Sequence, residues 1–337
     1  MRRLKDYMIN CVSAVALAAA ATACNADLRE LCYDHNHQEA RVRVSFDWSA
    51  VPGDPSPASM ALTVFAKGAQ PVETAFHGRD GGIVSLLPYT YSFAAFNDDG
   101  EALFHQGSTW EEFEIYAQRT DMTRLTRMFT RSASVPLARG TEDQPVILEP
   151  DPLWTAAQST TEVTVDRENT LLMTMENAIT EYTFRIENVE NLSYAVELLG
   201  TLSGMSGSWL PALHHGSSTH CVLPVTLEGD GSELVGRVRT FGHCYGEGDD
   251  HSEHLLTIYA EMKDGSKVYI TTDVTEAMHD ADHTDPVDGG SGHTEIPIVI
   301  DQLPLPKPIT NGSGLQPAVS EWQEVEISIP MGEWHAY

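Results

Sequence analysis

Histidines are the side chains whose chemistry stands out first in this chain, which has 14 of them. Several fall in short stretches with cysteines and acids, namely His214, His215, His220 and Cys221; His243 and Cys244; Asp249, Asp250, His251 and His254; and His279, Asp280, Asp282, His283 and Asp285. Imidazole and thiolate are good zinc ligands. The spacing, however, matches no HExxH, paired CxxC or calcium-loop pattern. We therefore predict no metal site and no cofactor, and we interpret residues 276–295 as a solvated polar loop.

Catalytic signatures are equally weak. Residues 204–208 (GMSGS) miss the G-x-S-x-G spacing of a nucleophile elbow, and no alternating βα pattern surrounds them. Adjacent acids such as Glu111 and Glu112 are expected by chance among 49 acidic residues. A glycosidase pair needs a set spatial separation that a sequence does not display. The sequence predicts no catalytic residue, and we expect a protein that is not an enzyme.

Cys24 is the residue with the clearest predicted chemistry. Residues 1–10 carry Arg2, Arg3 and Lys5, and residues 11–23 form an apolar or small-residue run. Such a pattern is typical of a secretory signal peptide, and the run is too short to cross a membrane, which takes roughly 20 residues. Cys24 follows the expected cut directly and resembles the acylated cysteine of the bacterial lipobox, although Ala21 stands where that motif usually has Leu. The alternative is a periplasmic protein that happens to begin with Cys.

Charge narrows the choice of partners. Without residues 1–23 the chain keeps 17 basic and 48 acidic residues, a net charge of −31. Such a charge opposes binding to nucleic acid, whose affinity comes from neutralised phosphates. It also opposes adsorption to anionic lipid, so a covalent lipid anchor suits this protein better. An apolar content of 42% is nevertheless enough for packed cores.

Three cysteines remain after Cys24. In the oxidising compartment that a signal peptide implies, Cys221 and Cys244 could form a disulfide, with Cys32 left over. The alternative is that all three are reduced and buried, because a sequence does not supply the required Cβ geometry.

The elements that must position these residues are strands. Apolar residues alternate with polar ones in many short runs, which are separated by Gly, Pro, Asn and Asp: residues 41–48, 61–66, 83–96, 162–165, 182–186, 222–227, 234–241, 255–262, 267–272, 295–300 and 324–331. This pattern predicts an all-β protein of sandwich type, with a hairpin turn at residues 263–266. Residues 188–203 and 110–119 are compatible with either helix or strands.

The 314 residues after the signal exceed one sandwich, so we expect two domains. Pro150 and Pro152 exclude regular ladder pairing and mark the boundary. We predict a signal peptide at 1–23, an N-terminal domain at 24–155 and a C-terminal domain at 156–337.

The last predicted strand has a regular alternation. Val325, Ile327, Ile329 and Met331 share one face, and Glu324, Glu326 and Ser328 share the other. A terminal strand is able to leave its own sheet and complete the sheet of another subunit through main-chain hydrogen bonds. The alternative is an ordinary last strand in its own sandwich.

Several stretches resemble one family: residues 31–35 (LCYDH) close behind Cys24, 182–186 (YTFRI), 189–192 (VENL), 202–205 (LSGM), and 298–301 with 303–306 (IVID, LPLP). Together they resemble the fimbrial anchor and accessory lipoproteins of the Bacteroidales, including uncharacterised members. The stretch at 276–295 has no counterpart that we match to the family.

The resemblance implies two tandem transthyretin-like β-sandwiches, a lipid anchor in the outer membrane, and a role in fimbria anchoring, assembly or adhesion with fimbrial subunits as partners. Asp27 and Glu30, soon after Cys24, indicate display on the outer face. It also implies that residues 324–331 are the donated strand and residues 41–48 a retained first strand. The alternative function is a surface lipoprotein that binds glycan or another ligand through loops, with exposed tryptophans as the platform.

Overall fold

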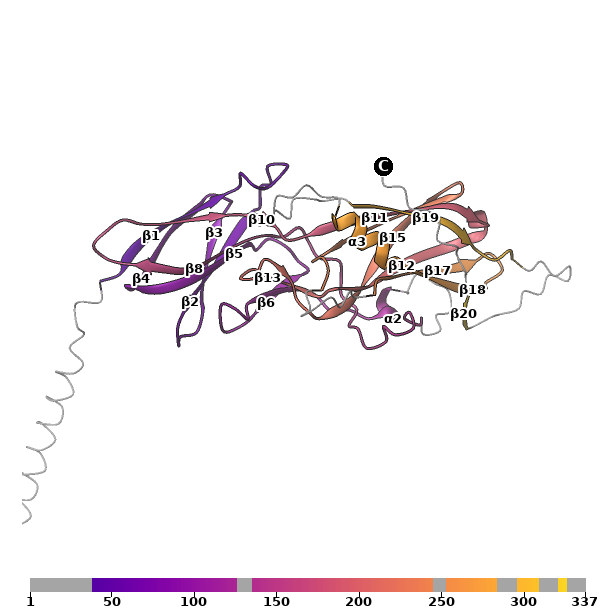
Figure 1. Ribbon diagram of the computed structural model, residues 1–337, viewed down its shortest axis with the longest axis horizontal. Coiled ribbons are helices and arrows are strands. Elements are labelled where there is room, and N and C mark those ends of the chain that lie inside the picture. The colour runs from indigo at the N-terminus through magenta and orange to yellow at the C-terminus, as the bar shows by residue number, and fades with distance from the viewer. Residues whose placement is uncertain (1–37, 126–134, 245–252, 284–295, 309–320, 326–337) are drawn as a thin grey trace, which may run out of the picture.

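The computed structural model describes residues 38–125, 135–244, 253–283, 296–308 and 321–325, and Figure 1 shows two β-sandwiches in tandem along the long axis. Within this part the helices are α2 (Met122–Leu125), α3 (Thr275–His283) and the short 3₁₀ turn η2 (Leu192–Tyr194). The predicted all-β sandwich fold is confirmed. No helix in the described ranges has the length and apolar character needed to span a membrane.

The N-terminal sandwich consists of a three-stranded and a five-stranded sheet. The first has the order β4-β1-β9, from Gly81–Leu86, Ala40–Asp47 and Asn169–Thr174. The second has the order β10-β8-β5-β2-β3, from Glu176–Asn177, Trp154–Val163, Tyr89–Asn97, Ser59–Ala66 and Val72–His77. The apolar face of β1 meets buried residues of β2 and β5, such as Leu62 and Phe93, in one core. Period-two alternation in β1 thus marks a strand with one buried face.

The first sandwich takes its strands from both sides of position 155/156, where the sequence placed a domain boundary. Strand β8 follows Pro152 and pairs with β5, and β9 pairs with β1 in parallel. The two prolines do keep residues 150–153 out of the ladders, because proline has no N–H to donate. They interrupt the chain within this sandwich, since pairing resumes directly afterwards.

A small four-stranded sheet connects the two sandwiches. Its order is β14-β13-β7-β6, from His215–Gly216, Ser208–Leu210, Glu114–Ala117 and Leu103–Gln106. From β13, the indole Nε1 of Trp209 donates a hydrogen bond to Oγ1 of Thr155, 3.1 Å away in β8. Phe65 and Phe96 pack with Phe113 of this region into a core that continues through the C-terminal sandwich. Strands β2 and β5 are consequently buried on both faces.

The C-terminal sandwich is one eight-stranded sheet folded on itself. Its order is β19-β11-β16-β15-β12-β17-β18-β20, from Ile296–Pro304, Thr180–Glu190, Glu233–Thr240, His220–Asp230, Ala195–Ser206, Leu255–Met262, Lys267–Asp273 and Trp322–Glu324. The first half of β15, to Val225, pairs with β12, and its second half, from Thr226, pairs with β16. One strand therefore serves both layers. The predicted hairpin between β17 and β18 is confirmed, and residues 188–203 form strands around a turn.

The N-terminal core provides a stability test. Phe93 is fully buried at the centre of β5, and we expect Phe93→Ala to lower the free energy of unfolding by about 3–5 kcal/mol through lost burial and a residual cavity. Val72 is 61% exposed on the edge strand β3, so Val72→Ala should change it by no more than about 0.5 kcal/mol. Denaturant unfolding measures both, and equal effects would contradict this packing.

Candidate functional site

Strand β1, expected from the resemblance to be retained, occupies the centre of its sheet. Val44 pairs with Gly82 of antiparallel β4 on one side and with Leu171 of parallel β9 on the other. The inward side chains of Val42 and Val44 are each 1% exposed. Because both edges are paired and the inner face is buried, this strand fills the first sheet of its own sandwich.

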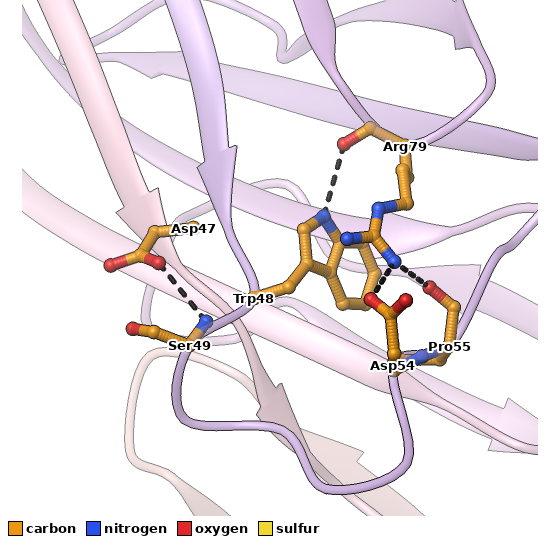
Figure 2. A network of polar contacts seen from close by, with 6 residues as sticks. All are labelled: Asp47, Trp48, Ser49, Asp54, Pro55 and Arg79. Carbon is orange, nitrogen blue, oxygen red and sulfur yellow. Dashed lines mark hydrogen bonds and ion pairs between the residues drawn. The ribbon is translucent and has the colours of Figure 1, made fainter.

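A cluster of polar contacts fixes the end of β1 (Figure 2). The indole Nε1 of Trp48 donates a 3.0 Å hydrogen bond to the carbonyl oxygen of Arg79, in the turn between β3 and β4. The guanidinium of Arg79 lies 5.7 Å from the centre of the Trp48 ring, a cation–π distance. Its Nη1 also donates to Oδ1 of Asp54 and the carbonyl oxygen of Pro55, both at 2.6 Å. These contacts tie the strand end to two neighbouring loops.

Next to this cluster, the backbone N–H of Ser49 donates a 3.0 Å hydrogen bond to Oδ1 of Asp47. This bond lowers the pKa of the Asp47 carboxyl by stabilising its charged form. The turn that follows β1 is therefore also held by a local bond.

The last described strand has fewer paired residues than β1. Among the described residues, strand β20 lies at the sheet edge and pairs in parallel with β18 alone, from Trp322 opposite Lys267 to Glu324 opposite Tyr269. The backbone N–H of Val325 donates a 3.0 Å bond to the carbonyl oxygen of Tyr269, and the half-buried Val325 side chain packs on the core. Of the predicted donor side chains, Ile327, Ile329 and Met331 lie outside the described residues.

Tryptophan platforms, expected for the glycan-binding alternative, are not found in the described part of the chain. Trp48 and Trp209 are buried, and Trp110, Trp154 and Trp322 are half-buried. Trp110 donates its Nε1 hydrogen to the carbonyl oxygen of Phe93, and Trp322 packs edge-on against Tyr259. The described indoles thus serve packing, while Trp334 falls outside this part.

The first serine of the stretch 204–208, Ser206, has a structural role. Ser206 is fully buried, and its hydroxyl lies 2.8 Å from the carbonyl oxygen of Ser208 and 3.1 Å from that of Ser217. A nucleophile needs an exposed hydroxyl beside a general base. Ser206 instead holds the turn between β12 and β14.

Cys221 and Cys244 are free thiols in the structure, so the suggested disulfide between them is not formed there. The Cys221 thiol lies 3.4 Å from the carbonyl oxygen of Ser206, and the Cys244 thiol lies 3.7 Å from that of Gly204. Burial raises the pKa of Cys221 well above its usual value and that of Cys244 to about 12. Both thiols are thus reduced as in the alternative, but only Cys221 is buried, while Cys244 is half-buried.

Three histidines from separate elements meet at one end of the C-terminal sandwich. His243 follows β16, His254 precedes β17, and His279 lies in α3. Each offers a ring nitrogen, and these atoms all lie within 4.8 Å of one another. The ring centres of His243 and His279 are 4.7 Å apart, and those of His254 and His279 are 5.2 Å apart. Such a group of imidazoles is able to hold a metal ion.

The cluster is buried and hydrogen-bonded. Nδ1 of His243 lies 2.8 Å from Nε2 of the fully buried His254, and Nε2 of His243 lies 3.0 Å from the hydroxyl of Tyr182. Burial, followed by the neighbouring His243 and His279, lowers the pKa of His254 to about 3. His254 is therefore neutral at physiological pH.

Histidines adjacent in sequence do not gather in this way. His214 contacts the carboxylate of Glu176 at 2.5 Å, which raises its pKa, and Nδ1 of His215 lies 2.7 Å from the carbonyl oxygen of Gly216. Sequence spacing missed the cluster because its members come from two strand ends and a helix. Each of the three stands in one of the histidine-containing stretches noted in the sequence, but those stretches did not indicate which histidines would meet.

The fold and these sites define an all-β protein of two joined sandwiches with a built-in first strand. A candidate adhesin from Bacteroides ovatus is similar, with a TM-score of 0.60 and 16% identity over 81% of this chain and 95% of that one. The fimbrial anchor protein Mfa2 from Porphyromonas gingivalis has a TM-score of 0.49 and 12% identity, over 77% of this chain and 90% of that one. A candidate polysaccharide-binding protein from Bacteroides thetaiotaomicron has a TM-score of 0.49 and 12% identity, over 78% of this chain and 91% of that one.

In sequence, residues 23–228 match the family described as a domain of unknown function, DUF5119. This match covers more than half of the chain, and the chain belongs to that family. Comparison with curated proteins found no match. The two-sandwich fold that the short motifs implied is confirmed by the similarity in fold to the Bacteroides ovatus protein.

The contacts around Trp48 predict a measurable loss of stability. Trp48→Phe removes the hydrogen bond to the carbonyl oxygen of Arg79 and leaves part of the ring space empty, so we expect a loss of about 1–3 kcal/mol in denaturant unfolding. Tyr89→Phe, at a ring 47% exposed on β5, is the control and should stay within about 0.5 kcal/mol. An unchanged stability in Trp48→Phe would mean that the end of β1 is held in another way.

Cysteine chemistry gives a second test. Because the raised pKa values leave little thiolate, iodoacetamide at mildly alkaline pH should alkylate neither Cys221 nor Cys244 in the folded protein. Both should react after unfolding without reductant. Peptide mass spectrometry measures this, and a Cys221–Cys244 linked peptide in the non-reduced digest would show the opposite state.

Proposed function

We propose that this chain is a non-enzymatic outer-membrane lipoprotein, attached through Cys24, that acts in fimbria anchoring, assembly or adhesion. The observation that carries the proposal is the central position of β1 between β4 and β9. A subunit whose own first strand is in place does not need a neighbour's strand to complete that sheet. Such a subunit could donate a strand without accepting one, so it is suited to the end of a row of subunits joined by strand exchange. The similarity in fold to a candidate adhesin supports a role at the cell surface.

The C-terminal segment is the part that we propose is donated to a fimbrial subunit. Strand β20 has three residues, one neighbour and an edge position, so few backbone bonds oppose its release. The alternation of residues 324–331 supplies apolar side chains at every second position. An acceptor groove would recognise this alternation through side-chain pockets and hold the segment through main-chain hydrogen bonds.

The glycan-binding alternative is less well supported. It relies on exposed tryptophans as the platform, and in the described ranges all tryptophans are buried or half-buried. This burial supports the fimbrial proposal over a glycan site built on tryptophan.

Lipid attachment predicts a change of location. We expect Cys24→Ala to move the protein from the membrane fraction to the soluble periplasmic fraction, because only the acylated thiol would provide tens of buried CH₂ groups at about 0.8 kcal/mol each. Cell fractionation with immunoblotting and intact-mass analysis measure this. Cys32→Ala is the matched control and should leave the protein on the membrane. If Cys24→Ala also stayed there, the anchor would lie elsewhere.

Strand donation predicts a dependence on the face of the last strand. Ile327→Asp, Ile329→Asp and Ser328→Asp each add one negative charge, but only the first two fall on the apolar face. A charge forced into an apolar pocket is strongly unfavourable, so we expect both isoleucine variants to lose a co-purifying fimbrial subunit and Ser328→Asp to keep it. Native purification from membranes with mass spectrometry of co-purifying chains measures the loss.

Two outcomes would contradict the donated strand. One is equal retention of the partner by all three variants, and the other is retention after deletion of residues 326–337. That deletion leaves β20 and Val325 in place, so it separates loss of the donor from loss of the fold. Unfolding curves of every variant provide the check on folding.

A further inference from the structure

We propose that His243, His254 and His279 form a binding site for one divalent transition-metal ion, with zinc as the expected ion. This site is independent of the proposed fimbrial function. Among the described side chains the ligand set is three imidazoles, which suit zinc, with no carboxylate of the kind that calcium or magnesium requires.

The hydrogen bonds of the cluster already aim the correct nitrogen atoms inward. Nδ1 of His254 lies 3.4 Å from the carbonyl oxygen of Ser203, which only accepts hydrogen bonds, so this nitrogen carries the proton and Nε2 keeps its lone pair. That lone pair faces Nδ1 of His243 at 2.8 Å. A hydrogen bond at this distance then requires Nδ1 of His243 to be the donor, so two potential ligand atoms point at the same space.

The outer partners follow the pattern found around bound metals. A ligating histidine usually contacts a carbonyl or another polar group through its second ring nitrogen, which fixes the ring. His254 has the carbonyl of Ser203 in this role, and His243 has the hydroxyl of the buried Tyr182 at 3.0 Å. A metal ion would take the place of the proton between the two rings. That proton would move from Nδ1 to Nε2 of His243, and the Tyr182 hydroxyl would then accept a hydrogen bond from Nε2.

The geometry allows an ion here. Tetrahedral zinc with Zn–N distances of about 2.0–2.1 Å needs ligand nitrogens roughly 3.4 Å apart. The present nitrogens lie within 4.8 Å of one another, so small rotations of the half-buried His243 and His279 bring them into range.

Hydrogen bonds and core packing fix the backbone segments that carry the cluster. The N–H of His254 donates a 2.8 Å hydrogen bond to Oγ1 of Thr275 at the start of α3. The N–H of Val274 donates a 2.9 Å hydrogen bond to the carbonyl oxygen of His254. Met278, next to His279, is fully buried in the core. An ion would thus link α3 to the sheet, and three protein ligands leave one position for water or an external ligand.

Zinc binding by the mature protein tests the proposal. The protein would be purified in detergent through a tag without histidine, stripped with chelator, and titrated with zinc by calorimetry. We expect one zinc per chain and a rise in the unfolding temperature, since an ion that binds only the folded state stabilises it. Cobalt in place of zinc should give the visible spectrum of a tetrahedral nitrogen site.

Variants assign the zinc to this cluster. His254→Gln and His279→Gln should each weaken binding by more than about 100-fold, and Tyr182→Phe by about 10-fold to 100-fold through loss of the outer partner. His214→Gln is the matched control, because His214 is exposed and pairs with Glu176, and it should bind like the wild type. Circular dichroism establishes which variants fold, and His279→Gln serves if the buried His254→Gln does not.

Two results would overturn the proposal. One is a wild-type protein that takes up no stoichiometric zinc, and the other is zinc that binds equally well to the folded His279→Gln variant. Neither result affects the strand-donation test, because that test measures the recovery of a partner subunit and not the metal content.

Discussion

The close approach of two backbones at Gly204 is the constraint on which the end of the C-terminal sandwich depends. A Cβ atom there would lie 2.2 Å from the carbonyl oxygen of Glu253, and the φ of +82° is also one that favours glycine. The register of β12 shifts at this point, between Ser203 and Met205. Met205 thereby forms bridges to both Cys221 and His243, and Ser203 reaches His254. Without that glycine, the segments that carry two of the three clustered histidines could not lie so close to β12.

Local patterns predicted the elements, whereas long-range pairing decided their assembly. The alternation of β1 and the turn of the β17–β18 hairpin are visible in the sequence because side-chain period and turn residues are local properties. The continuous apolar runs of β2 and β5 did not reveal that both faces are buried, because that depends on a second layer formed by β7 and β13. For the same reason Pro150 and Pro152 suggested a boundary inside the first sandwich, although β9 returns to pair with β1.

The candidate sites also differed in how far the sequence could predict them. The apolar face predicted for the terminal strand rests on alternation within one segment, and beyond Val325 it stays a prediction. The histidine cluster could not be predicted from the sequence, because His243, His254 and His279 become neighbours only after α3 docks beside the sheet through Thr275 and Met278. Ser206, which a motif brought to attention, proved to be buried. Short motifs therefore located turns and strands in this protein more reliably than they located chemistry.

The arrangement of β1 also has a consequence for tension. Were the protein anchored through Cys24 and pulled by a fibre, as we propose, the force would enter the described fold near Ala40 and run along this strand. Six residue pairs on each side link β1 to β4 and β9. Backbone bonds lie across the strand direction, so they are loaded in shear and share the force instead of opening one after another. The short edge strand β20 has three residue pairs with β18, and a lateral force would separate these pairs one after another. The first sandwich is thus the mechanically strong end of the molecule.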